Sequence, residues 1–412
     1  MFPSSNWRDT VSLSSSHRPG HSFMRVRLKS FVLLTIIIIA GLAGLPRSIS
    51  LGPVSLQALL TVGYVLAAWI LWFIRPVLTL TVLRSVWLFV LFILWTVVSL
   101  FWYKFTNSGF QNILVVTAFT GLILLAASVS RYGYKFQLRV GKTVGLATWI
   151  ASGIYGSSAV VWGLGSKFIS PRAFAAAALL GVAWYLSNWR YGSRKNLWWA
   201  GAIIVVMIAS LSRMASTLAL LLLPLSQLSL KNVRRWLQVV LLVGLAIVTF
   251  NLAVTHVEPL RDRFFEGDTK LQVGGAAINV AGRENYWQTA WDSYTESPWI
   301  GHGGGSAQEL MSLSTAGQVT HPHNDYLRIL HDYGAIGLGI WLLGYINLLW
   351  STWKFWIMAD RRRDPSAPLY LTAFLSLLAV ALVMITDNVM VYINVMAPLG
   401  ILVGAALGRK PG

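Results

Sequence analysis

The sequence feature that most constrains the fold is a series of apolar runs, each close to 20 residues long. A helix rises 1.5 Å per residue, so about 20 residues cross the roughly 30 Å of hydrocarbon in a bilayer. With 56% hydrophobic and 11% charged residues among 412, the chain also lacks the polar surface that soluble domains need. The sequence therefore predicts an all-α integral membrane protein.

Twelve apolar segments can be placed along the chain, and we expect about twelve transmembrane helices. They cover residues 31–46, 54–74, 86–103, 109–129, 143–164, 173–189, 197–212, 214–230, 236–255, 334–357, 368–386 and 389–407. The seventh and eighth are separated by a single charge, Arg213, so a re-entrant hairpin is an alternative there. One long polar loop, residues 256–333, lies between spans 9 and 10, and loops of this length are usually functional.

The distribution of charge predicts the orientation in the membrane. The net charge is +19, and basic residues at 25–29 precede the first span. The positive-inside rule places this N-terminus in the cytoplasm, and an even number of spans returns the C-terminus there. Most lysines and arginines then face the cytoplasm, where anionic lipids are their partners, and nucleic acid is not needed to explain them. The absence of cysteine excludes disulfides, thiolate catalysis and Cys-ligated metals.

This topology divides the chain into four parts. Residues 1–30 are expected to be a basic cytoplasmic tail, largely disordered over residues 1–24, and 31–255 to contain spans 1–9. Residues 256–333 form the polar loop on the outer side. Residues 334–412 contain spans 10–12 and the cytoplasmic C-terminus.

Within the polar loop, residues 283–296 have the spacing of a helix with one aromatic face, which Ser297-Pro298 ends. The aromatic rings either pack at the membrane interface or stack on sugars. Arg283 opens this helix, where the helix dipole disfavours a cation, so we expect an anionic partner such as Glu284, another carboxylate or a ligand. The run Gly301–Gly305 is either a flexible loop or an anion-binding nest.

The most informative stretch begins at His321. Pro322 favours extended backbone before it, and Asn324 or Asp325 can cap a helix that continues into span 10. His323 would then lie at the mouth of a helix at the membrane surface, where a base can meet a lipid-borne donor and a water-borne acceptor. The alternatives are a metal site of His321, His323 and Asp325, or histidines that only form hydrogen bonds at an interface.

Three basic residues contradict the expected charge distribution. Arg213 lies at the outer end of a span, where a buried arginine is costly and suggests a functional partner. A phosphate fits guanidinium geometry, and an arginine that reaches toward the interface is the alternative. Lys167 and Arg172, in a short outer loop, show the same feature less markedly.

Several of these motifs together resemble a known family. They are Ser-Arg at 212–213, Gly-Arg at 282–283 with Tyr286-Trp287 following, Pro298 to Gly303, and His-Asn at 323–324 with Gly334 and Gly337 beyond. In this order they resemble the O-antigen ligases and Wzy-type polysaccharide polymerases of bacterial envelopes. The resemblance implies about twelve helices, a large periplasmic loop, and a glycosyltransferase that uses no metal or other cofactor.

The resemblance also implies roles for individual residues. His323 would be the catalytic residue, and Arg213 and Arg283 would bind the diphosphate of a glycan donor carried on undecaprenyl diphosphate. Supporting roles are expected for five further residues: Asn324, His321, Arg328, Arg172 and Lys167. Attack opposite the diphosphate would invert the anomeric centre.

The acceptor is less constrained. A bacterial inner-membrane polymerase that adds to another glycan is slightly favoured, because the outer side offers no basic surface for a phosphorylated lipid A-core. The alternative is an O-antigen ligase that transfers to that core. Protein O-oligosaccharide transfer is less favoured. A twelve-span transporter is also less favoured, because the ionisable residues gather at the outer face rather than in mid-membrane.

Overall fold

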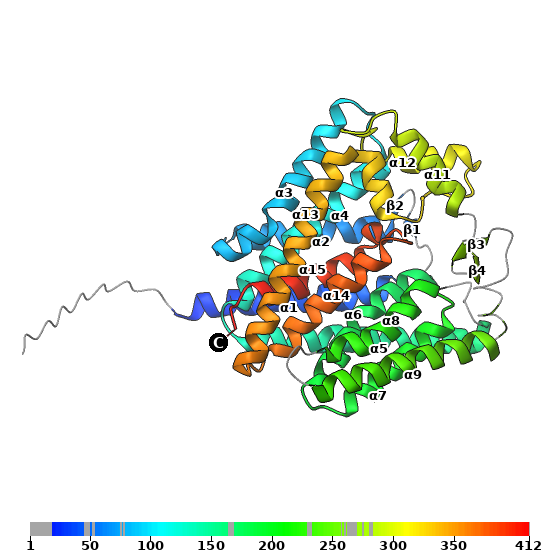
Figure 1. Cartoon of the computed structure of the whole chain (residues 1–412). Helices are drawn as coiled ribbons and strands as arrows, with labels where there is room; N and C mark the ends of the chain where they lie inside the picture. Colours follow the sequence, from blue (N-terminus) through cyan, green and yellow to red (C-terminus); the bar gives the residue numbers. More distant parts are fainter. Residues whose placement is uncertain are drawn as a thin grey trace, which may run out of the picture.

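The computed structural model describes residues 19–44, 50–51, 54–74, 76, 79–163, 169–228, 233–256, 258, 261, 270–273, 276–279 and 283–411. Figure 1 shows that these residues form mainly long helices, as the sequence predicts. Two small antiparallel hairpins accompany the helices. They pair β1 (Ser50–Leu51) with β2 (Val54–Ser55) and β3 (Lys270–Val273) with β4 (Ala276–Asn279).

A helix overlaps each of the twelve predicted apolar segments. In chain order these are α1 (Pro19–Ala43), α2 (Leu56–Phe73), α3 (Leu80–Val98), α4 (Asn107–Ser130), α5 (Tyr134–Trp162), α6 (Pro171–Arg190), α7 (Lys195–Ala209), α8 (Arg213–Gln227), α9 (Val233–His256), α13 (Asp325–Arg362), α14 (Ala367–Val383) and α15 (Ile393–Leu407). The polar loop contributes α11 (Arg283–Tyr294) and α12 (Ser306–Ser314), and two 3-10 turns are η1 (Ser99–Phe101) and η2 (Val389–Val391).

By length and composition, six helices among the described residues can cross a membrane: α1, α2, α3 with η1, α4, α5 and α13. Four more apolar stretches, in α7, α9, α14 and α15, are shorter. The chain is therefore a helical membrane protein, while the number of twelve spans and the side of each loop stay predictions. Helix α1 already begins at Pro19, so residues 19–24 are helical rather than disordered. Residues 1–18 lie outside the described part of the chain.

The sequence marks where several helices begin. Ser55, Thr79, Thr106 and Ser170 have extended backbone before α2, α3, α4 and α6, and each hydroxyl accepts a hydrogen bond from the N–H three residues on. Such a cap satisfies one of the four N–H groups that a helix start leaves unpaired, which matters more in a membrane because water cannot replace the bond. These four helices thus start at residues that the sequence defines.

Helix α4 packs extensively against α15 (Figure 1). Gly400 and Gly404 on α15, and Gly408 directly after it, lie about one turn apart and face α4. A Cβ atom at Gly404 would lie 2.3 Å from the carbonyl oxygen of Ile123, so only glycine permits this approach. Small residues at this spacing let membrane helices pack backbone to backbone.

Three further helices have their directions fixed by contacts at their ends. Arg190, at the end of α6, donates to the carbonyls of Ser226 and Leu228 at the end of α8, so these two packed helices run parallel. Helix α14 packs on both and runs the opposite way, because Asp387, after its C-terminus, and Arg172, at the start of α6, both lie beside His323. The starts of α6 and α8 and the end of α14 therefore share one end of the bundle, which we call the His323 end.

We expect Gly404→Leu to separate α4 from α15, because its side chain would meet backbone that cannot move aside. Overpacking of this kind costs about 3 kcal/mol or more. Thermal unfolding in detergent should show the loss. Gly201→Leu in α7, where nothing lies within 4 Å of the added Cβ, is the control and should unfold near the wild-type temperature. Equal unfolding temperatures for the two variants would contradict this packing.

Candidate functional site

The site is built around His323, which directly precedes the cap of α13. Asn324 has extended backbone, and its side-chain oxygen accepts the N–H of Leu327 at 3.0 Å, so the predicted cap and helix start are confirmed. His323 has φ of 54°, a left-handed conformation that is rare for a residue other than glycine. Strain of this kind is retained where surrounding contacts hold it and is common at functional sites. The imidazole is 21% exposed.

Side chains from two other helix ends surround the imidazole. Asn388 Nδ2 lies 3.1 Å from His323 Nδ1, and a carboxylate oxygen of Asp387 lies 3.6 Å from the same nitrogen. Both residues belong to the segment 384–392, which joins α14 to α15. From the start of α6, Arg172 Nη1 lies 3.4 Å from both ring nitrogens. One histidine thus meets a carboxylate, an amide and a guanidinium.

Asp387 carries a charge that its surroundings stabilise. Burial by itself would raise its pKa, but the hydrogen bond from His323, the charge of Arg172 and the N–H of Asn388 together hold the pKa of Asp387 below its usual range. The hydroxyl of Tyr392 adds a contact at 3.5 Å. A carboxylate that stays ionised at neutral pH can orient an imidazole and stabilise it once it takes up a proton.

Three of the four arginines singled out by the sequence lie at the very start of a helix. Arg172 is the second residue of α6, Arg213 the first of α8 and Arg283 the first of α11. A helix start carries partial positive charge, so each arginine adds to a positive field rather than neutralising one. Positive charge at three helix starts is unfavourable by itself, and a bound anion would offset it.

Two of these arginines are tied to the neighbourhood of His323 by the fold. Arg213 begins α8, which runs parallel to α6, so it lies at the His323 end of the bundle with Arg172. Arg283 lies one turn before Trp287 in α11. The indole N–H of Trp287 donates to the carbonyl of Pro322 at 2.9 Å, directly before His323. Contact of Arg213 or Arg283 with a common ligand stays a prediction.

The remaining predicted residues have different positions. Arg328 is 2% exposed and forms an ion pair with Asp325 at 2.8 Å, so it is enclosed in the fold rather than open to solvent. His321 lies near Arg328 and His323, whose charges act on it. Lys167 lies outside the described residues. Within the described ranges, no three His, Asp or Glu side chains are arranged to hold a metal ion, and the Asp325 carboxylate is engaged with Arg328 and Met390.

We expect His321 to make stability depend on pH. Burial, followed by the charges of Arg328 and His323, lowers the pKa of His321 to about 3, whereas an unfolded histidine titrates near 6.5. The unfolded chain therefore binds this proton first, so stability is full above about pH 6.5 and falls as the pH drops toward 3, by up to about 1.4 kcal/mol per unit.

The His321→Gln variant removes this titration and serves as the comparison. Between pH 7.5 and pH 5 the wild-type protein should lose more thermal stability in detergent than the variant. Parallel curves for the two proteins over that range would show that His321 does not carry the shift.

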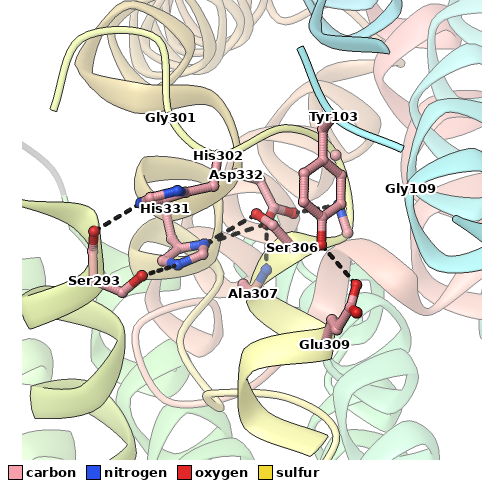
Figure 2. A network of polar contacts seen from close by, with 12 residues as sticks. Tyr103, Gly109, Ser293, Gly301, His302, Ser306, Ala307, Glu309, His331 and Asp332 are labelled. Carbon is pink, nitrogen blue, oxygen red and sulfur yellow. Dashed lines mark hydrogen bonds and ion pairs between the residues drawn. The ribbon is translucent and has the colours of Figure 1, made fainter. Parts of the chain in front are cut away.

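The glycine-rich loop contacts a carboxylate of the protein itself, that of Asp332, as Figure 2 shows. Asp332 accepts hydrogen bonds from the N–H groups of Gly305 and Ala307, at 3.1 and 2.7 Å, and from the hydroxyl of Ser306. Within Gly301–Gly305, the amide of Gly305 thus binds a carboxylate of α13, while the amides of Gly301, His302 and Gly303 donate to backbone carbonyls. Asp332 caps α12 from another helix and fixes the loop in place.

Two histidines extend this network. His331 Nδ1 lies 3.1 Å from the hydroxyl of Ser306 and its Nε2 lies 3.0 Å from the hydroxyl of Ser293, so it links α12 to α11. His302 stacks on His331 with ring centroids 4.8 Å apart, and contacts the carbonyl of Ser293 (Figure 2). These side chains, far apart in the sequence, join both helices of the polar loop to α13.

The same loop forms hydrogen bonds with α13 at a kink in that helix. Gly334 has φ of 67°, and a Cβ there would lie 2.2 Å from the carbonyl oxygen of Trp299. The bend exposes backbone groups of α13, and the loop pairs with them: Ala335 and Ile336 donate to Pro298 and Trp299, while His302 and Gly303 donate to His331 and Asp332. Residues 298–303 of the polar loop are therefore held against the kink of α13 by four backbone hydrogen bonds.

We expect Asp332→Asn to loosen this cap, because an amide presents only one acceptor oxygen to three donors and leaves buried polar groups unpaired. Hydrogen exchange of the amides at 303–307 should speed up by at least about tenfold. Asp292→Asn, at an exposed position of α11, is the matched control. Unchanged exchange in the Asp332 variant would contradict this role.

Sequence reasoning missed the closest partners of His323. Asp387 and Asn388 stand between two apolar segments, 368–386 and 389–407, and this isolated polar pair was the available signal. Arg172 was noted only as a less marked case, yet it contacts the imidazole.

The fold and the site together define a helical membrane protein in which an Asp–His pair and arginines at helix starts gather at one end of the bundle. Residues 197–342 match the family model Wzy_C, described as O-Antigen ligase. This match supports the expected resemblance: residues 197–342 are similar to the O-antigen ligases, a family of enzymes of ligase or polymerase type. The matched segment contains Arg213, Arg283 and His323, while Arg172 and Asp387 lie outside it. No curated protein matches the chain.

Proposed function

We propose that this protein transfers a glycan from undecaprenyl diphosphate to an acceptor hydroxyl at the periplasmic face of the bacterial inner membrane, with both chain termini in the cytoplasm. The observation that supports this best is the position of His323, 3.6 Å from Asp387 and 3.4 Å from Arg172. A base, a carboxylate that orients it and a cation for the leaving group are the parts that the reaction requires.

His323 acts as the general base. Its Nδ1 faces the Asp387 carboxylate and the Asn388 carboxamide, so Nε2, which Arg172 Nη1 approaches at 3.4 Å, is the nitrogen that meets the acceptor. The proton of the acceptor hydroxyl moves to Nε2 while its oxygen forms a bond to the anomeric carbon. The imidazolium that results lies beside a carboxylate whose pKa is held low, so its charge is stabilised where it forms.

The diphosphate departs from the opposite face of the sugar, which inverts the anomeric centre. The bond from the anomeric carbon to the phosphate oxygen breaks, and its electron pair stays on the diphosphate. A diphosphate is a stable leaving group, so neutralising its charge matters more than protonating it. Guanidinium groups at the starts of α6, α8 and α11 supply this charge in a partly dehydrated setting. These are Arg172, Arg213 and Arg283. This reaction needs no metal ion or other cofactor.

We expect His323→Ala to abolish transfer, by at least the roughly 10² to 10⁴-fold that a positioned base contributes. The measurement is transfer in proteoliposomes that contain purified lipid-linked glycan and acceptor, with and without a chelator. His256→Ala, at the exposed end of α9, is the matched histidine control and should keep wild-type activity. Both variants should insert and elute like the wild-type protein. Full activity of a folded His323→Ala protein would refute the assignment.

Polymerase and ligase activities share this chemistry and differ in the acceptor. A Wzy-type polymerase, which extends another lipid-linked glycan, is the first candidate, because the predicted outer surface is poor in basic residues. Ligation to lipid A-core is the second candidate, supported by the description of the matched family as O-antigen ligase. Proteoliposomes supplied with one acceptor at a time separate the two by their product, long polymer or capped core.

A further inference from the structure

We propose that Asp325 is the positioning residue of this site: paired with Arg328, it fixes the segment 384–392 against His323 and so sets the distance between the base and Asp387. The inference rests on the proposed function and assigns the arrangement of the site to one buried residue. Neither Asp325 nor Arg328 touches the imidazole in the contacts described above.

Asp325 binds the segment 384–392 at two points. Its N–H donates to the carbonyl of Met384 at 2.8 Å, and its carboxylate oxygen Oδ2 accepts the N–H of Met390 at 2.8 Å. These two points lie on either side of Asp387 and Asn388, three residues before the first and two after the second. The side chain is fully buried, so water does not compete for either bond.

The same residue is close to His323 along the chain. Asp325 is the first residue of α13 and lies two positions after His323, with only the cap residue Asn324 between them. The path from the imidazole to the carboxylate of Asp387 therefore runs through a few residues and two short hydrogen bonds. Such a short connection leaves little freedom in the separation of the two groups.

Arg328 makes this connection possible in a buried place. It lies one turn after Asp325, and its Nη2 is 2.8 Å from Oδ1, the oxygen that Met390 does not use. A buried carboxylate without a partner is costly, and so is a buried guanidinium. The ion pair offsets part of the cost of burying both charges, and it leaves Oδ2 to accept the N–H of Met390.

Position matters to the reaction because a base must lie within hydrogen-bond reach of the proton that it removes. Misplacement by about 1 Å can reduce a rate by about 10²-fold. If the segment 384–392 loosens, His323 loses the carboxylate that orients it although both residues remain. The effect should then fall on kcat rather than on KM for the glycan donor.

Two double variants isolate the hydrogen bond to Met390 from the loss of the ion pair. Asp325→Asn with Arg328→Met removes both charges but retains an oxygen for Met390. Asp325→Ala with Arg328→Met removes the same charges and the acceptor. In proteoliposomes, kcat of the alanine variant should be at least about 30-fold below that of the asparagine variant, with donor KM within about threefold. Asp292→Asn serves as the control for handling and should match the wild type.

Hydrogen exchange gives a second readout that does not depend on catalysis. Amides of residues 384–391 should exchange at least about tenfold faster in the alanine variant than in the asparagine variant, while the central α4–α15 amides keep their protection. If the alanine variant does not fold, Asp325→Ser with Arg328→Met replaces it. Its shorter side chain reaches Met390 less well, so its kcat should lie below that of the asparagine variant.

The outcomes separate the two proposals. Lower kcat together with faster exchange supports the positioning role. Faster exchange with equal kcat, or equal exchange in both variants, overturns it while leaving His323 as the base. Transfer that is undiminished in His323→Ala refutes His323 as the base, and a wild-type protein that transfers no glycan to either acceptor refutes the proposed function itself, whatever the exchange data show.

Discussion

The contact between His323 and the segment 384–392 is the interaction on which the site depends. It joins two parts of the chain that are more than 60 residues apart. One directly precedes the α13–α14 hairpin in the sequence, and the other directly follows it. Helices α13 and α14 pack along their lengths, and the hydroxyls of Tyr326 and Tyr345 donate to carbonyls of α14. This packing brings the start of one helix to the end of the other, where the polar residues of both can meet. A parallel arrangement of the same helices would separate His323 from Asp387.

Much of the fold follows from local patterns that the sequence displays. The helix over 283–294, its end before Ser297-Pro298 and the cap at Asn324 depend on neighbouring residues, so they were predictable. Helix ends were less so: α1 begins at Pro19 because its basic residues continue the helix before the apolar run. The kink at Gly334 also escaped prediction, since it needs a loop more than 30 residues upstream to accept and donate its hydrogen bonds.

In the candidate site, too, residues with a local sequence signal were predictable and residues placed only by the tertiary fold were not. His323 stood out because of its neighbours in sequence, Pro322 and Asn324. Asp387 has no such context, and only the antiparallel packing of α13 and α14 gives it a role. For the glycine run, Gly301–Gly305, the local sequence indicated a binding property but not the partner. Its amides were suited to an anion by their local chemistry, but Gly305 donates to the carboxylate of Asp332, 27 residues later, and Gly301, His302 and Gly303 donate to backbone carbonyls. Local chemistry indicates what a group can bind, and the tertiary fold decides which partner it receives.

The balance of charge around His323 bears on the kind of ligand that the site accepts. Asp325 and Arg328 neutralise one another, and Asp387 is shared between His323 and Arg172. The three helix starts that carry Arg172, Arg213 and Arg283 add partial positive charge of the same sign. A neutral sugar would gain little from that field, whereas a diphosphate carries enough negative charge to interact with several guanidinium groups at once. In the proposed reaction the field also acts in the right direction, because negative charge grows on the departing diphosphate while positive charge grows on the imidazole beside Asp387. Charge separation in that reaction is therefore stabilised at both ends. The buried hydrogen bonds of Asp325 hold the segment that carries Asp387, and those of Asp332 hold α12 against α13.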